Sequence, residues 1–140
     1  MTVVINAPDD IPEGHRLIYL AGAIDMGEAE NWQKKVISIL SKRDDLTLLN
    51  PRRSNFEPQM EEEQIKWELR ALEKADVILM WFPRESNAPI SLLEFGLYLK
   101  SGKLLVGVEN GFYRQRNIEL TAQYHGVSVF HSLAELVQRI

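Results

Sequence analysis

The sequence contains no cysteine. That absence excludes disulfide bonds and thiolate zinc sites, and it is compatible with the cytoplasmic location that we expect for the protein. Basic residues are not in excess, because 16 Lys and Arg stand against 20 Asp and Glu, which gives a net charge of −4. The chain therefore lacks the electrostatic basis for broad nucleic-acid binding, and we expect no nucleic-acid partner.

Long apolar runs are absent as well, since no stretch approaches the roughly 20 residues of a membrane-spanning helix. The N-terminal residues lack the basic and apolar regions of a signal peptide, so no membrane partner is expected. The segment 21–27 lacks the G-x-G-x-x-G spacing of a dinucleotide site, and no P-loop is present. His15, His125 and His131 show no ligand spacing, so we expect neither a metal site nor a cofactor.

What remains is an ordinary globular composition, with 45% apolar and 26% charged residues in a chain of 140. We expect a single domain over residues 1–140, in which residues 1–15 form an N-terminal arm. Residues 2–6 fit either a short strand or a loose part of that arm. Strands are predicted at 16–21, 46–49, 77–82, 104–108 and 127–130.

Helices are predicted between these strands, at 29–42, 60–74, from Pro89 to a stop at 101–103, and at 117–124, with a last helix capped by Ser132. Strands that alternate with helices predict a parallel sheet covered on both faces. The expected fold is therefore α/β, a three-layer sandwich around a five-stranded parallel sheet, of the flavodoxin-like or Rossmann-like type.

Glu94 is the one acidic residue in the otherwise apolar and small-residue segment 89–107. It lies one turn into the helix that follows the strand 77–82, at the sheet edge where open α/β folds bind ligands. A buried carboxylate at such a place indicates chemistry, because burying it is costly. The alternative is a carboxylate that faces solvent or pairs with Lys100 or Lys103.

Other candidates follow the first two core strands and are expected at the same edge. Tyr19 is either a core tyrosine or a hydroxyl that orients a carboxylate. Gly22 allows close approach of a ligand to the backbone, while Asp25 either binds substrate or caps the next helix. Arg52 and Arg53 are suited to a phosphate or carboxylate, although surface salt bridges would explain them equally.

Three further polar residues belong to helices or to the loop before Pro89. Glu68 lies in the helix 60–74, where a solvated helix face is the simple explanation. Asn87 precedes the Glu94 helix and Ser91 lies in its first turn, where its hydroxyl would bond the free backbone amides. Both are predicted to contact substrate.

The ordered segments IYLAGAID, NPRR, WELRALEKADVILMWFP, PISLLEFGLYLKSGK and RNIE resemble the nucleoside 2-deoxyribosyltransferase-like proteins, which include related nucleotide N-glycosidases. The resemblance runs from about Arg16 to the final helix. It implies a flavodoxin-like homo-oligomer with shared active sites. It also implies that Glu94 is the nucleophile, that Tyr19 holds its carboxylate, that Glu68 contacts the substrate, and that Asn117 is donated by a neighbouring subunit.

One position departs from the pattern, because Ala88 stands where the transferases carry an aspartate that handles the base. The resemblance thus implies cleavage or exchange of the N-glycosidic bond of a nucleoside or nucleoside monophosphate, with transfer and hydrolysis both open. A non-catalytic module that binds a nucleotide or nucleotide-sugar is the alternative from another class. An NAD-cleaving glycosidase would share the carboxylate nucleophile.

Overall fold

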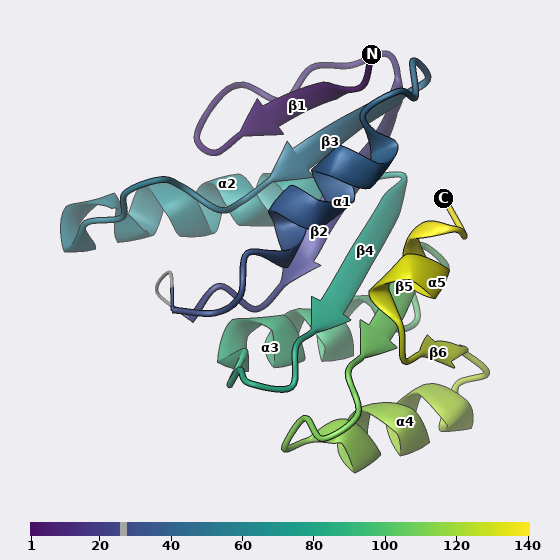
Figure 1. Cartoon of the computed structure of the whole chain (residues 1–140). Coiled ribbons are helices and arrows are strands. Elements are labelled where there is room, and N and C mark those ends of the chain that lie inside the picture. The colour runs from purple at the N-terminus through teal and green to yellow at the C-terminus, as the bar shows by residue number, and fades with distance from the viewer. Residues whose placement is uncertain (26–27) are drawn as a thin grey trace. The chain divides into compact units, whose positions relative to one another are not determined.

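The computed structural model of the chain describes residues 1–25 and 28–140 (Figure 1). The strands are β1 Val3–Asn6, β2 Arg16–Gly22, β3 Leu46–Asn50, β4 Val77–Phe82, β5 Leu104–Val108 and β6 Val129–Phe130. The α-helices are α1 Trp32–Leu40, α2 Glu61–Lys74, α3 Pro89–Tyr98, α4 Gln115–Tyr124 and α5 Leu133–Val137, and a short 3-10 helix, Pro58–Met60, precedes α2.

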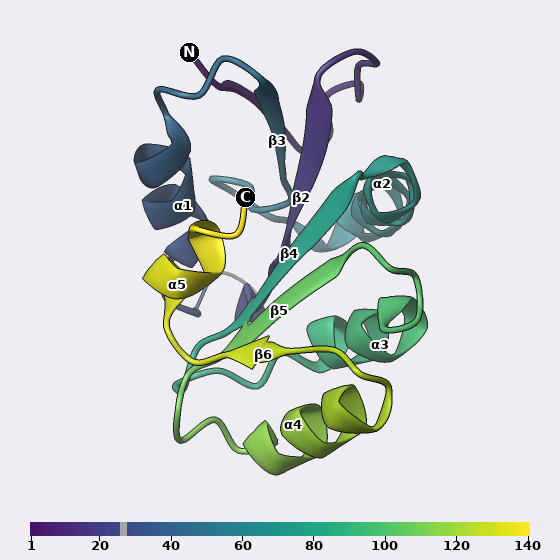
Figure 2. The ribbon, with the colours of Figure 1, turned by 90° about the vertical axis from the view of Figure 1, so that its right-hand side faces the viewer.

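The described residues form two compact units, and the first consists of Met1–Leu20 and Asn31–Val77. Its strands run in parallel in the order β1, β3, β2, with Val3 opposite Thr47 and Arg16 opposite Leu46. Helix α1 lies on one face of these strands and α2 on the other (Figure 2). Large apolar side chains pack between the strands and each helix, as the fully buried indoles of Trp32 and Trp67 show.

The second unit consists of Ala21–Glu30 and Ile78–Ile140. Strand β5 lies between β4 and β6 and pairs with both in parallel. Helix α3 covers one face of β4 and β5 and α5 the other (Figure 2), while α4 packs beside β6. The core strands are apolar along their length, as expected for strands that helices cover on both faces.

The predicted fold class is confirmed: helices alternate with parallel strands and flank them on both faces, which is the three-layer α/β arrangement of flavodoxin-like and Rossmann-like proteins. The predicted number of five strands is wrong, because the described residues form six. The additional strand is β1, which pairs with β3 along its whole length. Residues 3–6 are therefore a strand and not a loose arm.

Helices α1 and α4 begin at residues other than those predicted, and α4 begins at Gln115 instead of residue 117. Helix α1 begins at Trp32 and not near residue 29, because the side chain of Asn31 caps it by accepting a hydrogen bond from the backbone of Lys34. In α3, Leu93 and Leu97 are exposed together with Ile90, so the apolar segment 89–107 is not buried along its whole length. Within the described ranges, no helix is long and apolar enough to cross a membrane.

Candidate functional site

Glu94 lies in the second turn of α3, in the second unit, and only 7% of it is exposed to solvent. The next residue, Phe95, packs edge-on against Phe82 of β4, with 6.4 Å between ring centroids. The low exposure of Glu94 itself shows that its carboxylate is turned away from solvent. The alternative of a solvent-facing carboxylate is therefore wrong. A buried carboxylate at the start of a helix after a strand is the arrangement that the sequence predicted.

The start of α3 has an unusual backbone conformation. Pro89 occupies the first helical position, where its missing N–H costs nothing. The N-cap residue is Ala88, which has φ 47° and ψ 50° and no side chain able to accept a hydrogen bond. For a residue with a Cβ, this left-handed region costs about 1–2 kcal/mol. Some other group must therefore hold the chain in this conformation.

Asp25 supplies that group from the same unit. Its Oδ2 accepts a hydrogen bond from the backbone N–H of Asn87 at 2.8 Å, and its Oδ1 accepts one from the N–H of Ala88 at 3.0 Å. The expectation that Asp25 caps the next helix along the chain is wrong, since Asn31 caps α1. The carboxylate instead bonds the amides at the start of α3, the helix that carries Glu94. A negative charge is favourable at that end of a helix.

The second unit also contains the predicted site residues Gly22, Asn87, Ser91 and Asn117. Asn87 is exposed, and its carbonyl oxygen accepts a hydrogen bond from the hydroxyl of Tyr113 at 2.9 Å. Ser91 is buried in the first turn of α3. Gly22 ends β2 with φ 145°, a conformation that favours glycine. Asn117 is exposed on α4. Contact of these residues with a substrate stays a prediction.

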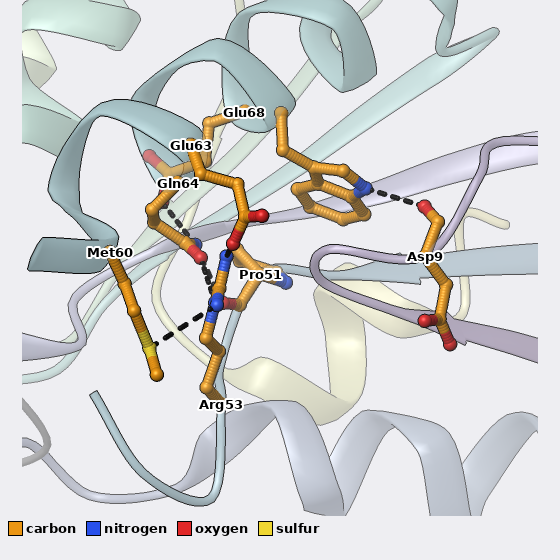
Figure 3. Close-up of polar contacts among 8 residues, drawn as sticks. Asp9, Pro51, Arg53, Met60, Glu63, Gln64 and Glu68 are labelled. Atoms are coloured by element: carbon orange, nitrogen blue, oxygen red, sulfur yellow. Dashed lines mark hydrogen bonds and ion pairs between the residues drawn. The ribbon is translucent and has the colours of Figure 1, made fainter. Parts of the chain in front are cut away.

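In the first unit, Arg53, Gln64 and Glu68 form a connected polar network (Figure 3). The guanidinium of Arg53 donates through Nε to Gln64 Oε1 and through Nη2 to Glu63 Oε1, the latter at 2.9 Å. Its Nη1 lies 3.5 Å from the sulfur of Met60. The side chain of Arg53 is 9% exposed and that of Glu63 is 57% exposed, so the salt bridge offered as the alternative explanation is present, although its arginine is largely buried.

Gln64 is the centre of this network, and the sequence analysis missed it. Its amide nitrogen donates to the carbonyl oxygen of Pro51 at 2.8 Å and to Glu68 Oε2 at 2.7 Å. Gln64 therefore connects the loop after β3 with a carboxylate on α2. The spacing of four residues between Gln64 and Glu68 was the one signal in the sequence that predicts their contact.

Glu68 is half-buried and does not lie on a solvated helix face. Burial raises its pKa, because removal from water disfavours the charged form, while the hydrogen bond from Gln64 and the charge of Arg53 lower it in part. An acid with this combination of partial burial and positioned donors is suited to bind hydroxyl groups. The arrangement supports the predicted contact of Glu68 with a substrate, which no bound molecule tests.

Tyr19 is a core residue of the first unit, with 1% of its surface exposed. Its ring packs against that of Trp67 on α2, with centroids 6.3 Å apart and planes inclined by 59°. Trp67 is itself fixed, because its indole N–H donates to the carbonyl oxygen of Asp9 at 2.8 Å (Figure 3). The tyrosine ring therefore has a defined position, which a residue that orients another group requires.

Arg52 also lies in the first unit, after β3. Its Nη1 donates to Gln33 Oε1 of α1 at 3.2 Å, and its backbone N–H donates to Asn50 Oδ1 at 3.1 Å. Gln33 is fully buried, and in the described part of the chain its amide nitrogen makes no hydrogen bond. Both of these contacts are with neutral groups, and contact of Arg52 with a substrate stays a prediction.

Tyr113 is the second residue that the sequence analysis missed, and nothing in its local sequence points to Asn87, 26 positions earlier. Among residues 1–25 and 28–140, no three histidine or acidic side chains gather as a metal site requires. The polar groups of the two units are thus carboxylates, amides, hydroxyls and guanidinium groups. These are the groups with which proteins bind sugars and nucleobases.

Comparison with protein-family models gave a match. The family model described as nucleoside 2-deoxyribosyltransferase like matches residues 15–112 of the 140. The matched range contains Tyr19, Asp25, Glu68 and Glu94 and ends just before α4. A search of curated proteins gave no match.

Proposed function

The chain belongs to the nucleoside 2-deoxyribosyltransferase-like family, and on that premise we propose that it cleaves or exchanges the N-glycosidic bond of a nucleoside or nucleoside monophosphate. The observation that carries the proposal is Glu94, a buried carboxylate in the second turn of α3. By the resemblance, it takes the position of the family's nucleophile. The family points to an enzyme of the deoxyribosyltransferase type in general, and the covalent ribosyl-Glu94 intermediate is our proposal.

In the proposed first step, an ionised oxygen of Glu94 attacks the anomeric carbon of the sugar. The bond from that carbon to the base nitrogen breaks, and its electron pair leaves with the base, which takes up one proton. The carboxylate also stabilises the positive charge that develops on the sugar in the transition state. The product of this step is a ribosyl ester and a free base.

In the second step, an acceptor attacks the same carbon and releases Glu94 as a carboxylate. Water as acceptor gives hydrolysis and loses a proton, whereas a second base gives exchange. We assign Tyr19 to orienting the nucleophile and Glu68 and Asn117 to the sugar hydroxyls. These roles are proposed from the resemblance, and the buried ring of Tyr19 and the bonded carboxylate of Glu68 support them.

A 5′-phosphate, where the substrate has one, is assigned to Arg52 in preference to Arg53. All three guanidinium nitrogens of Arg53 already contact Gln64, Glu63 or Met60. Withdrawing Arg53 from these contacts would leave the half-buried Glu68 without its neighbouring positive charge. Arg53 is therefore better suited to support Glu68 than to bind phosphate.

We further propose that the protein is a homo-oligomer. Ile90, Leu93 and Leu97 are exposed on α3, and their spacing places them along one side of that helix. Apolar side chains gathered on an exposed helix side are typical of protein interfaces. A second copy of the chain is the proposed partner, in line with the shared active sites that the resemblance implies.

The alternative is a module that binds a nucleoside or nucleotide without turning it over. Ala88 favours it, because the carboxylate that handles the base in the transferases is missing from this position. A binding module would retain the buried polar groups of the site and release no base. The two functions therefore differ in one measurable product.

The deciding experiment uses chromatography to measure the release of free base from a panel of nucleosides, their 5′-monophosphates and NAD. We expect release from at least one nucleoside or monophosphate, and a loss of most of the rate in Glu94→Ala. Glu85→Gln, which removes an exposed carboxylate from the same unit, is the control and should keep wild-type turnover. A covalent sugar adduct on Glu94 in trapped wild-type protein, detected by mass spectrometry, would support the ester.

Three results would contradict the proposal in different ways. Near-native turnover in Glu94→Ala on every substrate of the wild type would exclude Glu94 as nucleophile. Binding of a nucleoside by the wild type without base release or adduct would favour the non-catalytic module. Release of nicotinamide from NAD alone would identify the NAD-cleaving glycosidase.

A further inference from the structure

Asp25 makes a contact that its predicted role in substrate binding does not require. Each oxygen of its carboxylate accepts a hydrogen bond from a backbone amide, one from Asn87 and one from Ala88. The two amides belong to consecutive residues, and the second is the N-cap of α3. The carboxylate therefore holds the peptide from which the nucleophile helix starts.

This contact replaces the side-chain cap that α3 lacks. The N-cap Ala88 has a left-handed conformation and no side-chain acceptor. Another residue must therefore stabilise this conformation and accept a hydrogen bond from the Ala88 amide. Two hydrogen bonds to a charged acceptor together outweigh the cost of the left-handed alanine. Asp25 is itself left-handed, with φ 49°, which aspartate tolerates better than most residues.

The same peptide is held from its other side. The hydroxyl of Tyr113 donates to the carbonyl oxygen of Asn87, so both polar groups of that residue's backbone are bonded. Earlier in the loop, the buried hydroxyl of Ser86 donates to the carbonyl oxygen of Pro83 at 2.6 Å. The loop between β4 and α3 therefore enters the helix in one defined conformation.

Glu94 lies six residues after Ala88, which corresponds to about 9 Å along a helix axis. A helix is stiff over that length, so a change in the direction or rotation of its first turn moves Glu94 as well. Displacement of a reacting group by about 1 Å can cost on the order of 100-fold in rate. We propose that Asp25 is a positioning residue for the reaction, which acts through the start of α3 to set the place of the Glu94 carboxylate.

This inference rests on the proposed function and is tested by steady-state base release from Asp25→Ala and Asp25→Asn. We expect kcat of Asp25→Ala to fall about 10- to 100-fold while KM changes less than about threefold, because the chemistry and not substrate binding is disturbed. Asp25→Asn should lie between, since its one carbonyl oxygen can bond one amide while its NH₂ group opposes the other. Circular dichroism and thermal unfolding establish that each variant is folded.

Ser132→Ala is the matched control, because Ser132 caps α5 in the same unit by accepting from the backbone N–H of Glu135. Its loss should lower the midpoint of thermal unfolding and leave kcat unchanged. A kcat of Asp25→Ala within about twofold of wild type would refute the inference, as would a raised KM with unchanged kcat, which would make Asp25 a substrate-binding residue. Absence of base release by the wild type would refute the proposed function, and the inference with it.

Discussion

Loss of the Gln64 side chain should destabilise the first unit strongly for a side chain of this size. In Gln64→Ala, three hydrogen bonds disappear: one from Arg53, one to Pro51 and one to Glu68. A neutral hydrogen bond contributes about 1 kcal/mol and one with a charged partner about 1.5–3 kcal/mol. The loss is smaller than the sum of these contributions, because Arg53 keeps its hydrogen bond to Glu63 and water reaches the half-buried Glu68. We therefore expect a total loss of about 2–4 kcal/mol in the free energy of unfolding.

Urea unfolding at equilibrium measures this loss. Gln123→Ala is the control, because it removes an exposed glutamine from α4 and should change the free energy of unfolding by less than about 0.5 kcal/mol. If Gln64→Ala were as stable as this control, the network around Gln64 would not stabilise the folded state. The reasoning from its contacts would then be refuted.

The loss should also depend on pH, in a direction that follows from Glu68. Because burial raises the pKa of Glu68 in the folded state, its stabilising contribution is present below the unfolded pKa and is lost as pH rises through the folded pKa. The hydrogen bond from Gln64 lowers the pKa of Glu68 in the folded state. Its removal therefore leaves the burial cost of the ionised carboxylate less well offset. Gln64→Ala should therefore lose more stability at pH 7 than at about pH 4, near the unfolded pKa of a glutamate. An equal loss at both values would contradict this assignment.

Two further predictions concern the second unit. A Cβ at Gly107 would lie 2.8 Å from Cε3 of Trp81, so Gly107→Ala should destabilise the fold by about 1–3 kcal/mol in thermal unfolding. A Cβ at Gly96 on α3 would meet open space, so Gly96→Ala should stabilise the fold by about 0.5–1 kcal/mol in the same measurement. Equal effects at the two glycines would contradict this. Leu93→Glu with Leu97→Glu should convert the proposed oligomer to a monomer in light scattering, and an unchanged mass would exclude this side of α3 as the interface.

The elements that the sequence predicted best are the ones with the strongest local signal. The strands Val77–Phe82 and Leu104–Val108 have the predicted bounds, because each is a short aliphatic run that ends at polar or turn residues. Residues 3–6 form a run of only four residues, which is too short to separate an edge strand from a loose arm, and only their pairing with β3 decides it. The start of α1 was also predicted wrongly, because capping by Asn31 competes with a helical start near residue 29.

The candidate site divides along the same line. The burial of Glu94 was predictable, because its apolar neighbours and its place after a buried strand are visible in the sequence. The partners of Asp25 were not, since 62 and 63 positions separate it from Asn87 and Ala88. Contacts between such distant positions depend on how the chain folds back, which local spacing does not encode. Composition and period therefore predicted where a carboxylate is buried but not what holds its helix.

Ala88 and Asp25 are best understood as one feature. An aspartate at position 88 would match the transferases and would suit the left-handed backbone better than alanine. It would also place a second negative charge next to the carboxylate that bonds the Ala88 amide at 3.0 Å. At about 5 Å and an effective dielectric constant of about 20–40, this repulsion is roughly 2–3 kcal/mol, which exceeds the gain in backbone energy.

We therefore expect Ala88→Asp to destabilise the wild type and to be tolerated in Asp25→Asn, where the opposing charge is gone. Thermal unfolding of the two single variants and the double variant measures the coupling, which should be at least about 1 kcal/mol in favour of the double variant. Additive effects would show that the two positions are independent. If they are coupled, the missing carboxylate at position 88 is a consequence of how this chain holds α3, and the proton for the leaving base comes from a group other than residue 88.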